Sequence, residues 1–164
     1  MQEYVLDLIA RHRQQPVLDD ANILLLHFIG SFDRDLVGRF KRTAQYVPDD
    51  FILLRRLLSL FRGILTTPNI LTEVSNLASR IQDPLRTHFF ESFRDRIQVL
   101  DERFVPSAEA SRQDEFTRLG LTDVVLARIA AKQFLVLTDD LNLYLCLEQH
   151  GVDVLNFSHI RQFS

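Results

Sequence analysis

The chain has 164 residues, which fits one domain (1–164) able to bury roughly 70% of its unfolded surface. Hydrophobic residues make up 46% and charged residues 25%, with only 5 Gly and 5 Pro, which excludes a disordered or fibrous chain. The net charge is −3, and Lys41 and Lys132 are the only lysines among 19 basic residues. The arginines suit bidentate phosphate contacts, although a solvated arginine-rich surface explains the same count.

Three features favour a cytoplasmic protein without a membrane segment. The first residues include Glu3 and Asp7 and lack the basic start and apolar run of a signal peptide. No apolar run reaches the ~20 residues that cross a bilayer. The single Cys146 allows neither an internal disulfide nor a thiolate metal site, which favours a reducing compartment.

In chain order, residues 2–14 have helical spacing and end before Pro16. A short buried strand at 17–18 then leads into Asp19 and Asp20, and an apolar helix follows. Residues 32–62 predict extra helical material, with a helix that starts at Pro48 and that Gly63 caps.

The middle of the chain predicts a second strand at 64–66, followed by Thr67 and Pro68, which suit the start of a helix. Glu73 lies on that helix at the margin between its apolar stripe and solvent. A longer amphipathic helix follows over 83–100. Phe104 and Val105 then predict a third strand, and Ser111 begins a pattern typical of a helix start.

The last third of the chain predicts the clearest strand, 134–138, which ends directly in Asp139 and Asp140. Before it, Gly120 opens a helix with Asp123 in its first turn, and after it come a helix over 141–149 and a strand over 152–157. Alternating strands and helices indicate parallel pairing through right-handed crossovers. The expected fold is therefore a three-layer α/β/α sandwich around a parallel sheet of about 4–5 strands.

The acidic residues fall where such a fold binds ligands, outside the carboxyl ends of the strands. If the first and fourth strands are neighbours, Asp19, Asp20, Asp139 and Asp140 share one rim. Carboxylates packed together raise one another's pKa unless a cation neutralises them. Oxygen ligands without clustered Cys or His favour Mg²⁺ or Mn²⁺ over Zn²⁺, and such ions serve phosphodiester hydrolysis.

Four motifs in order resemble the PIN-domain ribonucleases, from about Pro16 to Phe157: L-D-D-A-N, T-P-N-I-L-T-E, G-L-T-D-V-V-L and L-T-D-D-L-N-L. The resemblance implies that the catalytic and metal-holding acids match Asp20, Glu73, Asp123 and Asp140. Asp139 remains a second contender for the last position. The family also implies that Asn22 and Thr138 steady the site by hydrogen bonds, and it leaves Asp19 as an extra acid beside the site.

The resemblance implies an RNA substrate and, for the toxin members of the family, an antitoxin protein partner. The sequence departs from the compact toxins by the helical insertion 32–62. Its apolar face could pack internally, form a homodimer or receive an antitoxin segment. Surface arginines that could guide RNA are Arg55, Arg56, Arg80, Arg118 and Arg128.

Other readings of the acids are weaker. A receiver domain needs a lysine after the last strand, and neither lysine lies there. A haloacid-dehalogenase-type phosphatase needs a second acid where Asn22 stands. The remaining alternative is a PIN-like fold that binds metal or protein without catalysis, and clustered acids that cost stability argue against it.

Overall fold

The computed structural model describes residues 2–131 and 133–162. Within them, five parallel strands form one sheet in the order β3-β2-β1-β4-β5. The strands are β1 (Val17–Asp19), β2 (Ile64–Thr66), β3 (Asp101–Glu102), β4 (Val136–Thr138) and β5 (Val154–Asn156). The expected parallel sheet and α/β class are confirmed.

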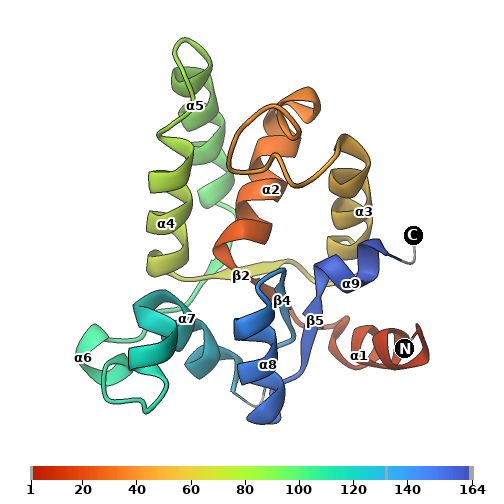
Figure 1. Ribbon diagram of the computed structural model, residues 1–164, viewed down its shortest axis with the longest axis vertical. Coiled ribbons are helices and arrows are strands. Elements are labelled where there is room, and N and C mark those ends of the chain that lie inside the picture. Colours follow the sequence, from red (N-terminus) through yellow and green to blue (C-terminus); the bar gives the residue numbers. More distant parts are fainter. Residues whose placement is uncertain (1, 132, 163–164) are drawn as a thin grey trace.

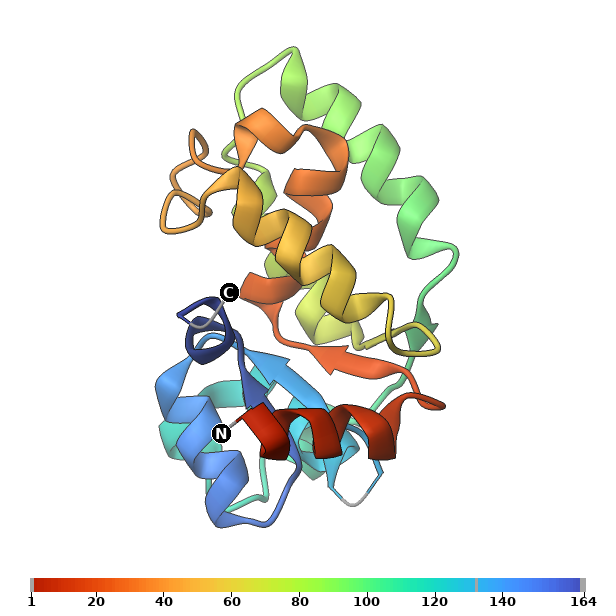
Figure 2. The ribbon, with the colours of Figure 1, turned by 90° about the vertical axis from the view of Figure 1, so that its right-hand side faces the viewer.

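Helices cover both faces of this sheet. The helical segments are α1 (Gln2–His12), α2 (Ala21–Phe32), the 3₁₀ turn η1 (Arg34–Leu36), α3 (Pro48–Leu58), α4 (Pro68–Ala78), α5 (Leu85–Ile97), α6 (Ser107–Ala110), α7 (Phe116–Ala130), α8 (Leu141–Gln149) and α9 (Phe157–Arg161). Helices α2, α3, α4 and α5 lie on one side of the sheet, and α1, α7 and α8 lie on the other (Figures 1 and 2). This is the three-layer arrangement that the sequence predicts.

Helix α2 lies at the centre of the layer that α2, α3, α4 and α5 form on one side of the sheet. Its sequence is apolar on every side, and Ile23, Leu24 and Leu26 have no exposed surface. The reason is its position, because it contacts α3, α4 and α5 as well as β4. A helix that is hydrophobic all round is stable only when neighbours cover its whole circumference.

The insertion 32–62 packs against α2 rather than projecting from the domain. Phe40, Phe51 and Phe61 are 7%, 4% and 8% exposed. Of the three uses considered for this apolar face, the structure therefore supports internal packing. These three side chains are not available to a second copy or to an antitoxin.

The contact between α2 and α3 depends on a missing side chain at Gly30. A Cβ atom at this position would lie 2.3 Å from two ring carbons of Phe51. We expect Gly30→Ala to lower the free energy of unfolding by about 1–3 kcal/mol, because overpacking outweighs the helix propensity of alanine. Urea unfolding measures this. Gly63→Ala is the matched control, since no atom lies within 4 Å of its Cβ position; equal stability of both variants would contradict the packing account.

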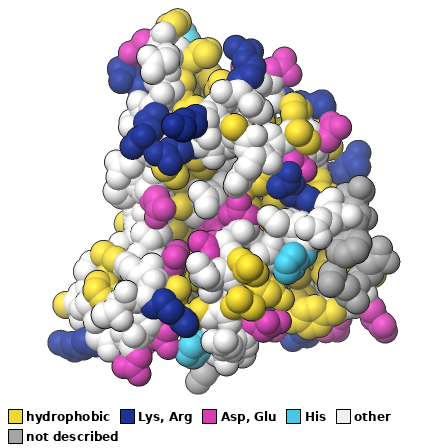
Figure 3. Space-filling model, viewed as in Figure 1, with side chains coloured by type: hydrophobic (Ala, Val, Ile, Leu, Met, Phe, Trp, Pro, Cys, Tyr) yellow, Lys and Arg dark blue, Asp and Glu magenta, His cyan; other side chains and the backbone are white. Residues whose placement is uncertain are grey.

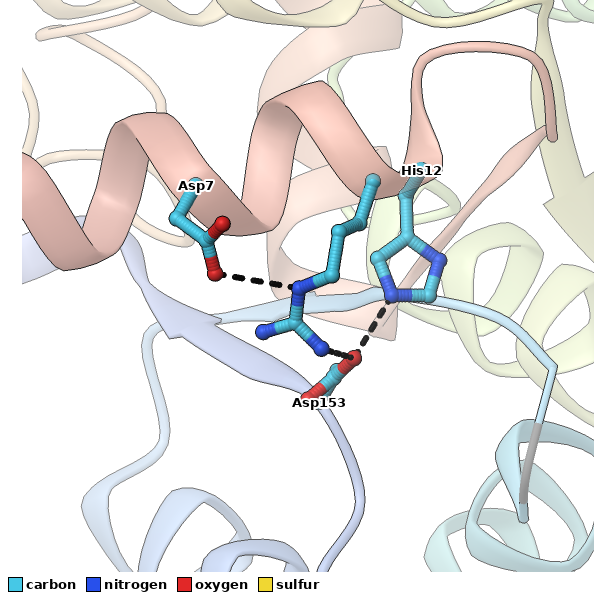
Figure 4. Close-up of polar contacts among 4 residues, drawn as sticks. Asp7, His12 and Asp153 are labelled. Carbon is cyan, nitrogen blue, oxygen red and sulfur yellow. Dashed lines mark hydrogen bonds and ion pairs between the residues drawn. The ribbon is translucent and has the colours of Figure 1, made fainter.

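A cluster of polar side chains attaches helix α1 to the residue before β5 (Figure 4). The Asp153 carboxylate, just before β5, lies 2.7 Å from His12 Nε2 and 3.0 Å from an Arg11 guanidinium nitrogen. Arg11 also pairs with Asp7 at 3.1 Å. The exposed Arg11–Asp7 pair contributes about 0–1 kcal/mol, and the His12–Asp153 contact is partly buried.

Several local predictions are wrong. The third strand is Asp101–Glu102, not Phe104 and Val105, and Phe104 is 72% exposed. This strand pairs only with β2, and an exposed edge strand needs no apolar residues. Ser111 ends α6 instead of starting a helix, and α3 ends at Leu58, several residues before Gly63.

No helix in residues 2–131 and 133–162 is long and apolar enough to cross a membrane.

Candidate active site

The chain reverses its direction across the sheet between β1 and β4. From β1 it proceeds to β2 and β3 on one side, and it then returns to place β4 on the other side of β1. Asp19 lies in register with Leu137, so the carboxyl ends of both strands reach the same rim. Such a switch point is the usual ligand-binding position of an open α/β sheet.

Asp20 is the first acid at this rim. It follows β1 and caps the N-terminus of α2, where its Oδ1 accepts a 2.8 Å hydrogen bond from the Ile23 amide. Its Oδ2 accepts hydrogen bonds from the Thr138 hydroxyl and, at 3.3 Å, from the Asp139 amide. The side chain is only 4% exposed. Three hydrogen bonds, one from α2 and two from the end of β4, therefore fix one orientation of this carboxyl group, and the Asp20 amide donates to the Leu137 carbonyl at 3.0 Å.

Burial raises the pKa of Asp20 from its ordinary value of 3.8 to about 7. The nearby Asp139 carboxylate is the second cause, and Asp123 adds a smaller effect in the same direction. Hydrogen bonds from Ile23 and Thr138 act in the opposite direction because they favour the ionised form. Asp20 therefore lies in the electric field of acids from two other elements.

Thr138 connects the two strand ends. It is buried at the end of β4, where its hydroxyl donates to Asp20 and accepts a 3.0 Å hydrogen bond from the Asp140 amide. This is the hydrogen bonding that the PIN resemblance implies for Thr138. Asn22, in contrast, is exposed in the first turn of α2, and its side chain makes no hydrogen bond within the described ranges.

Asp139 is held by the insertion, a contact that the sequence did not reveal. Its Oδ2 accepts hydrogen bonds from the Tyr46 hydroxyl and, at 2.8 Å, from the Gln45 amide nitrogen. Tyr46 is 1% exposed, and Arg161 of α9 lies over its ring at 5.0 Å. Arg161 also pairs with Asp50 at 2.8 Å, which ties the insertion to the end of the chain.

The other oxygen of Asp139, Oδ1, is buried and has no hydrogen-bond partner in the described residues. Burial and the Asp139 carboxylate raise the pKa of Tyr46, so its phenol stays protonated as a donor. Asp139 thus has one oxygen fixed and one buried oxygen without a partner. A buried carboxylate oxygen without a donor is costly unless a cation or water reaches it.

Asp140 has a different role in the structure. It caps α8, and its Oδ1 accepts hydrogen bonds from the Asn142 and Leu143 amides at 2.7 and 3.0 Å. Its side chain is exposed, and its second oxygen accepts no hydrogen bond from the residues described. Within the described residues, Asp139 therefore keeps one buried carboxyl oxygen without a hydrogen-bond partner, and Asp140 keeps one on an exposed side chain.

Asp123 and Glu73 complete the cluster from α7 and α4, which are in contact, with α7 below the lower end of α4 in Figure 1. Gly120 adopts φ 78° and breaks α7, so that Asp123 lies in the first turn of the helix that follows the kink. The pKa of Asp123 is raised to about 6, first by burial and then by the carboxylates of Glu73 and Asp140. The five predicted acids are therefore electrostatically coupled.

Asp19 is the least expected residue of the rim. It is fully buried at the end of β1, and neither carboxyl oxygen has a hydrogen-bond partner among the described residues. Burial, and then the Asp20 carboxylate, raise the pKa of Asp19 well above its ordinary value. The Thr66 hydroxyl at the end of β2 is also buried without a partner. We have no physical account of why an acid occupies this position.

The carboxylate oxygens of these acids are suitable ligands for a hard divalent cation, but the side chains do not surround a single metal position. Acidic side chains gather in the middle of the face shown in Figure 3. All the donors are carboxylate oxygens, the type that Mg²⁺ and Mn²⁺ prefer, and Asp139 Oδ1 lacks a partner. Within the described ranges, however, no three His, Cys, Asp or Glu side chains are placed to hold one metal ion.

Comparison with protein families, with curated proteins and with solved structures gave no match.

Proposed function

We propose that the protein is a Mg²⁺- or Mn²⁺-dependent endoribonuclease of the PIN-domain type. The observation that supports it best is the coupling of acids from separate elements at the switch point. Asp139 and Asp123 both raise the pKa of Asp20, and Glu73 and Asp140 both raise the pKa of Asp123. Such mutual repulsion is relieved when a divalent cation binds.

A divalent cation held by Asp20, Glu73, Asp123 and Asp139 or Asp140 would supply Lewis-acid stabilisation of charge on a phosphate. The chain itself contributes positioning. Thr138 and two backbone amides fix Asp20, while Tyr46 and Gln45 fix Asp139. Carboxylates fixed in advance need little reorganisation when the site binds its ligands.

The position of the arginines narrows which of them can contact RNA. Arg118 lies 2.7 Å from Cys146 Sγ, Arg128 pairs with Glu109, and Arg55 lies over the Phe51 ring. Arg56 and Arg80 are exposed and have no ion-pair partner within the described ranges. Of these two, Arg80 follows α4, the helix that carries Glu73, and is therefore the stronger candidate for RNA contact.

The toxin assignment is the finer part of the proposal. If the protein is the toxin of a toxin–antitoxin pair, an antitoxin protein restrains its cleavage of RNA. A homodimer is an assembly to be tested. The buried faces of the insertion leave the rim and its surroundings as the surface that such a partner would cover. A partner that binds there would block the acids directly.

A catalytically silent module is the second candidate. It is favoured by one observation, namely that no three ligand side chains in the described ranges are placed to hold a metal ion. This candidate predicts metal or protein binding without cleavage of RNA.

The proposal is tested by incubating end-labelled structured RNA with the purified chain, with Mn²⁺ or with EDTA. We expect cleavage only with metal, and a loss of at least ~100-fold in Asp123→Asn and Glu73→Gln, because each removes a carboxylate that would hold the metal ion whose charge stabilises the transition state. Asp49→Asn is the matched control. Its carboxylate is exposed and pairs only with Arg34, at 3.0 Å.

Two outcomes contradict the proposal. Equal cleavage by the wild type and both site variants would assign the activity to a contaminating nuclease or to another site. Metal binding by the wild type with no cleavage of any RNA would favour the silent module.

A further inference from the structure

A pocket of about 380 Å³ lies between the insertion and the end of α4, and basic side chains dominate its rim. Arg39, Lys41 and Arg42 come from the loop after η1, and Arg80 comes from the residues after α4. We call these four residues the basic pocket. Together they concentrate four positive charges in a protein whose net charge is −3.

All four side chains of the basic pocket are exposed. In residues 2–131 and 133–162, none of the four forms an ion pair or a side-chain hydrogen bond. Several other arginines of the protein differ in this respect. Arg11, Arg34, Arg86, Arg94, Arg128 and Arg161 each pair with a carboxylate. Unpaired cations held side by side repel one another, and an anion removes that repulsion.

The floor of the basic pocket is apolar. Phe40 and Ile81 are 7% and 5% exposed, whereas Leu85 at the start of α5 is 39% exposed. A free inorganic anion would gain nothing from this floor. A nucleotide unit would gain from both parts, because its phosphate meets the cations and its ribose or base covers apolar surface.

The basic pocket and the acidic rim share α4. Glu73 lies within α4, and Arg80 follows the C-terminal end of the same helix, which is Ala78. At ~1.5 Å of rise per residue, Ala78 lies roughly 8 Å from Glu73 along the helix axis. Figure 3 shows Lys and Arg side chains gathered over the end of α4, on the same face as the acidic group and above it. One nucleic-acid strand can therefore reach both places, because ~3.4 Å of rise per nucleotide makes a separation on the order of 10 Å a span of a few nucleotides.

We propose that the basic pocket binds a backbone phosphate of the RNA strand, a few nucleotides from the phosphate that lies at the acidic rim. This inference rests on the proposed function. It assigns the insertion a role in holding substrate, since the insertion supplies three of the four cations. Arginine forks give bidentate contacts to a phosphate, and Lys41 adds a point charge.

Binding is measured by fluorescence anisotropy with a labelled single-stranded RNA of 12 nucleotides in EDTA, on the Asp20→Asn background. Without metal and without Asp20 no cleavage interferes, and loss of binding is distinct from loss of catalysis. We expect Arg39→Ala/Arg42→Ala to raise Kd at least ~10-fold. The slope of log K against log salt should fall by about 1.4, because two phosphate contacts of ~0.7 each are lost on a single strand.

The matched control is Arg13→Ala/Arg62→Ala on the same background. Both residues are exposed and unpaired within the described ranges, and they precede β1 and β2 at the opposite edge of the sheet. Their loss should change Kd less than 2-fold. Circular dichroism melting curves of all variants check that each is folded, and Arg80→Ala alone provides a single change outside the insertion.

Equal Kd values for the pocket variant and the control, or no RNA binding by the Asp20→Asn parent, would overturn the inference. Displacement of RNA by poly-glutamate at equal charge concentration would also overturn it, and would assign the basic pocket to an acidic protein partner instead. If RNA binds through the basic pocket but the wild type does not cleave it, the inference of RNA binding is supported and the nuclease proposal is contradicted.

Discussion

In EDTA, the protein should lose about 4 kcal/mol of stability as the pH rises from 4 to 7. Asp20 is 4% exposed, and its pKa is raised from 3.8 to about 7 on folding. Between these values the native state binds more protons than the unfolded state, so stability is complete below pH 4 and is lost as the pH rises towards 7. Each pKa unit corresponds to ~1.4 kcal/mol.

Urea unfolding at a series of pH values in EDTA measures this dependence. The Asp20→Asn variant is the control, because asparagine retains the acceptor for the Ile23 amide and is a good N-cap. Its stability should fall less over the same range. Asp19 and Asp123 have their pKa values raised as well, so a smaller dependence above pH 4 should remain in that variant. A wild-type stability that rises steadily from pH 4 to 7 would contradict the account of the rim.

At pH 7.5, Mn²⁺ should raise the melting temperature of the wild type by about 5–10 °C at 100 times its Kd. Ligand binding to the native state alone contributes ~2.7 kcal/mol at that ratio, and 1 kcal/mol shifts a domain of this size by about 2–4 °C. The effect is expected because the metal replaces the repulsion among Asp20, Asp123 and Asp139 by attraction. Thermal melts followed by circular dichroism, with and without Mn²⁺, give the shift.

Asp123→Asn and Asp20→Asn should lose most of the Mn²⁺ shift, whereas Asp49→Asn should keep it. Each site variant removes one carboxylate of the coupled cluster. Asp49, in contrast, is exposed and pairs with Arg34, which lies outside the cluster. No shift of the wild type at millimolar Mn²⁺ would mean that the carboxylates do not form a metal site. An equal shift in all four proteins would indicate binding elsewhere.

The sequence predicted the part of the site that depends on strand ends. A buried strand followed by an acid and an apolar helix is a local signal, and it placed both Asp20 and Thr138 correctly at the ends of β1 and β4. The rule that parallel strands end at one edge then predicted that these residues meet. The hydrogen bond from Thr138 to Asp20 shows that they do.

The sequence could not predict contacts between distant loops. Tyr46 belongs to a loop with no helical or strand periodicity, 93 residues from Asp139, so nothing local indicates that its hydroxyl reaches this acid. The same is true of the basic pocket, whose cations come from two loops almost 40 residues apart. Such pairs are determined by tertiary packing, which periodicity does not encode.

The burial of Asp19 is not indicated by the sequence. No local pattern around an acid at a strand end predicts that both of its carboxyl oxygens are enclosed without a donor among the described residues. For edge strand β3, the sequence predicts apolar residues, and this prediction is wrong. Its two acidic residues are exposed, and their strand pairing to β2 is carried by backbone groups alone.

The most direct test of the central claim is the rate of RNA cleavage by wild type and Asp20→Asn, purified identically and assayed with enzyme in excess over end-labelled RNA. The account predicts Mn²⁺-dependent cleavage by the wild type and a rate at least ~100-fold lower for the variant, because Asp20 lies at the centre of the coupled acids. Equal rates for the two proteins, or a wild-type rate that is the same in EDTA, would contradict it.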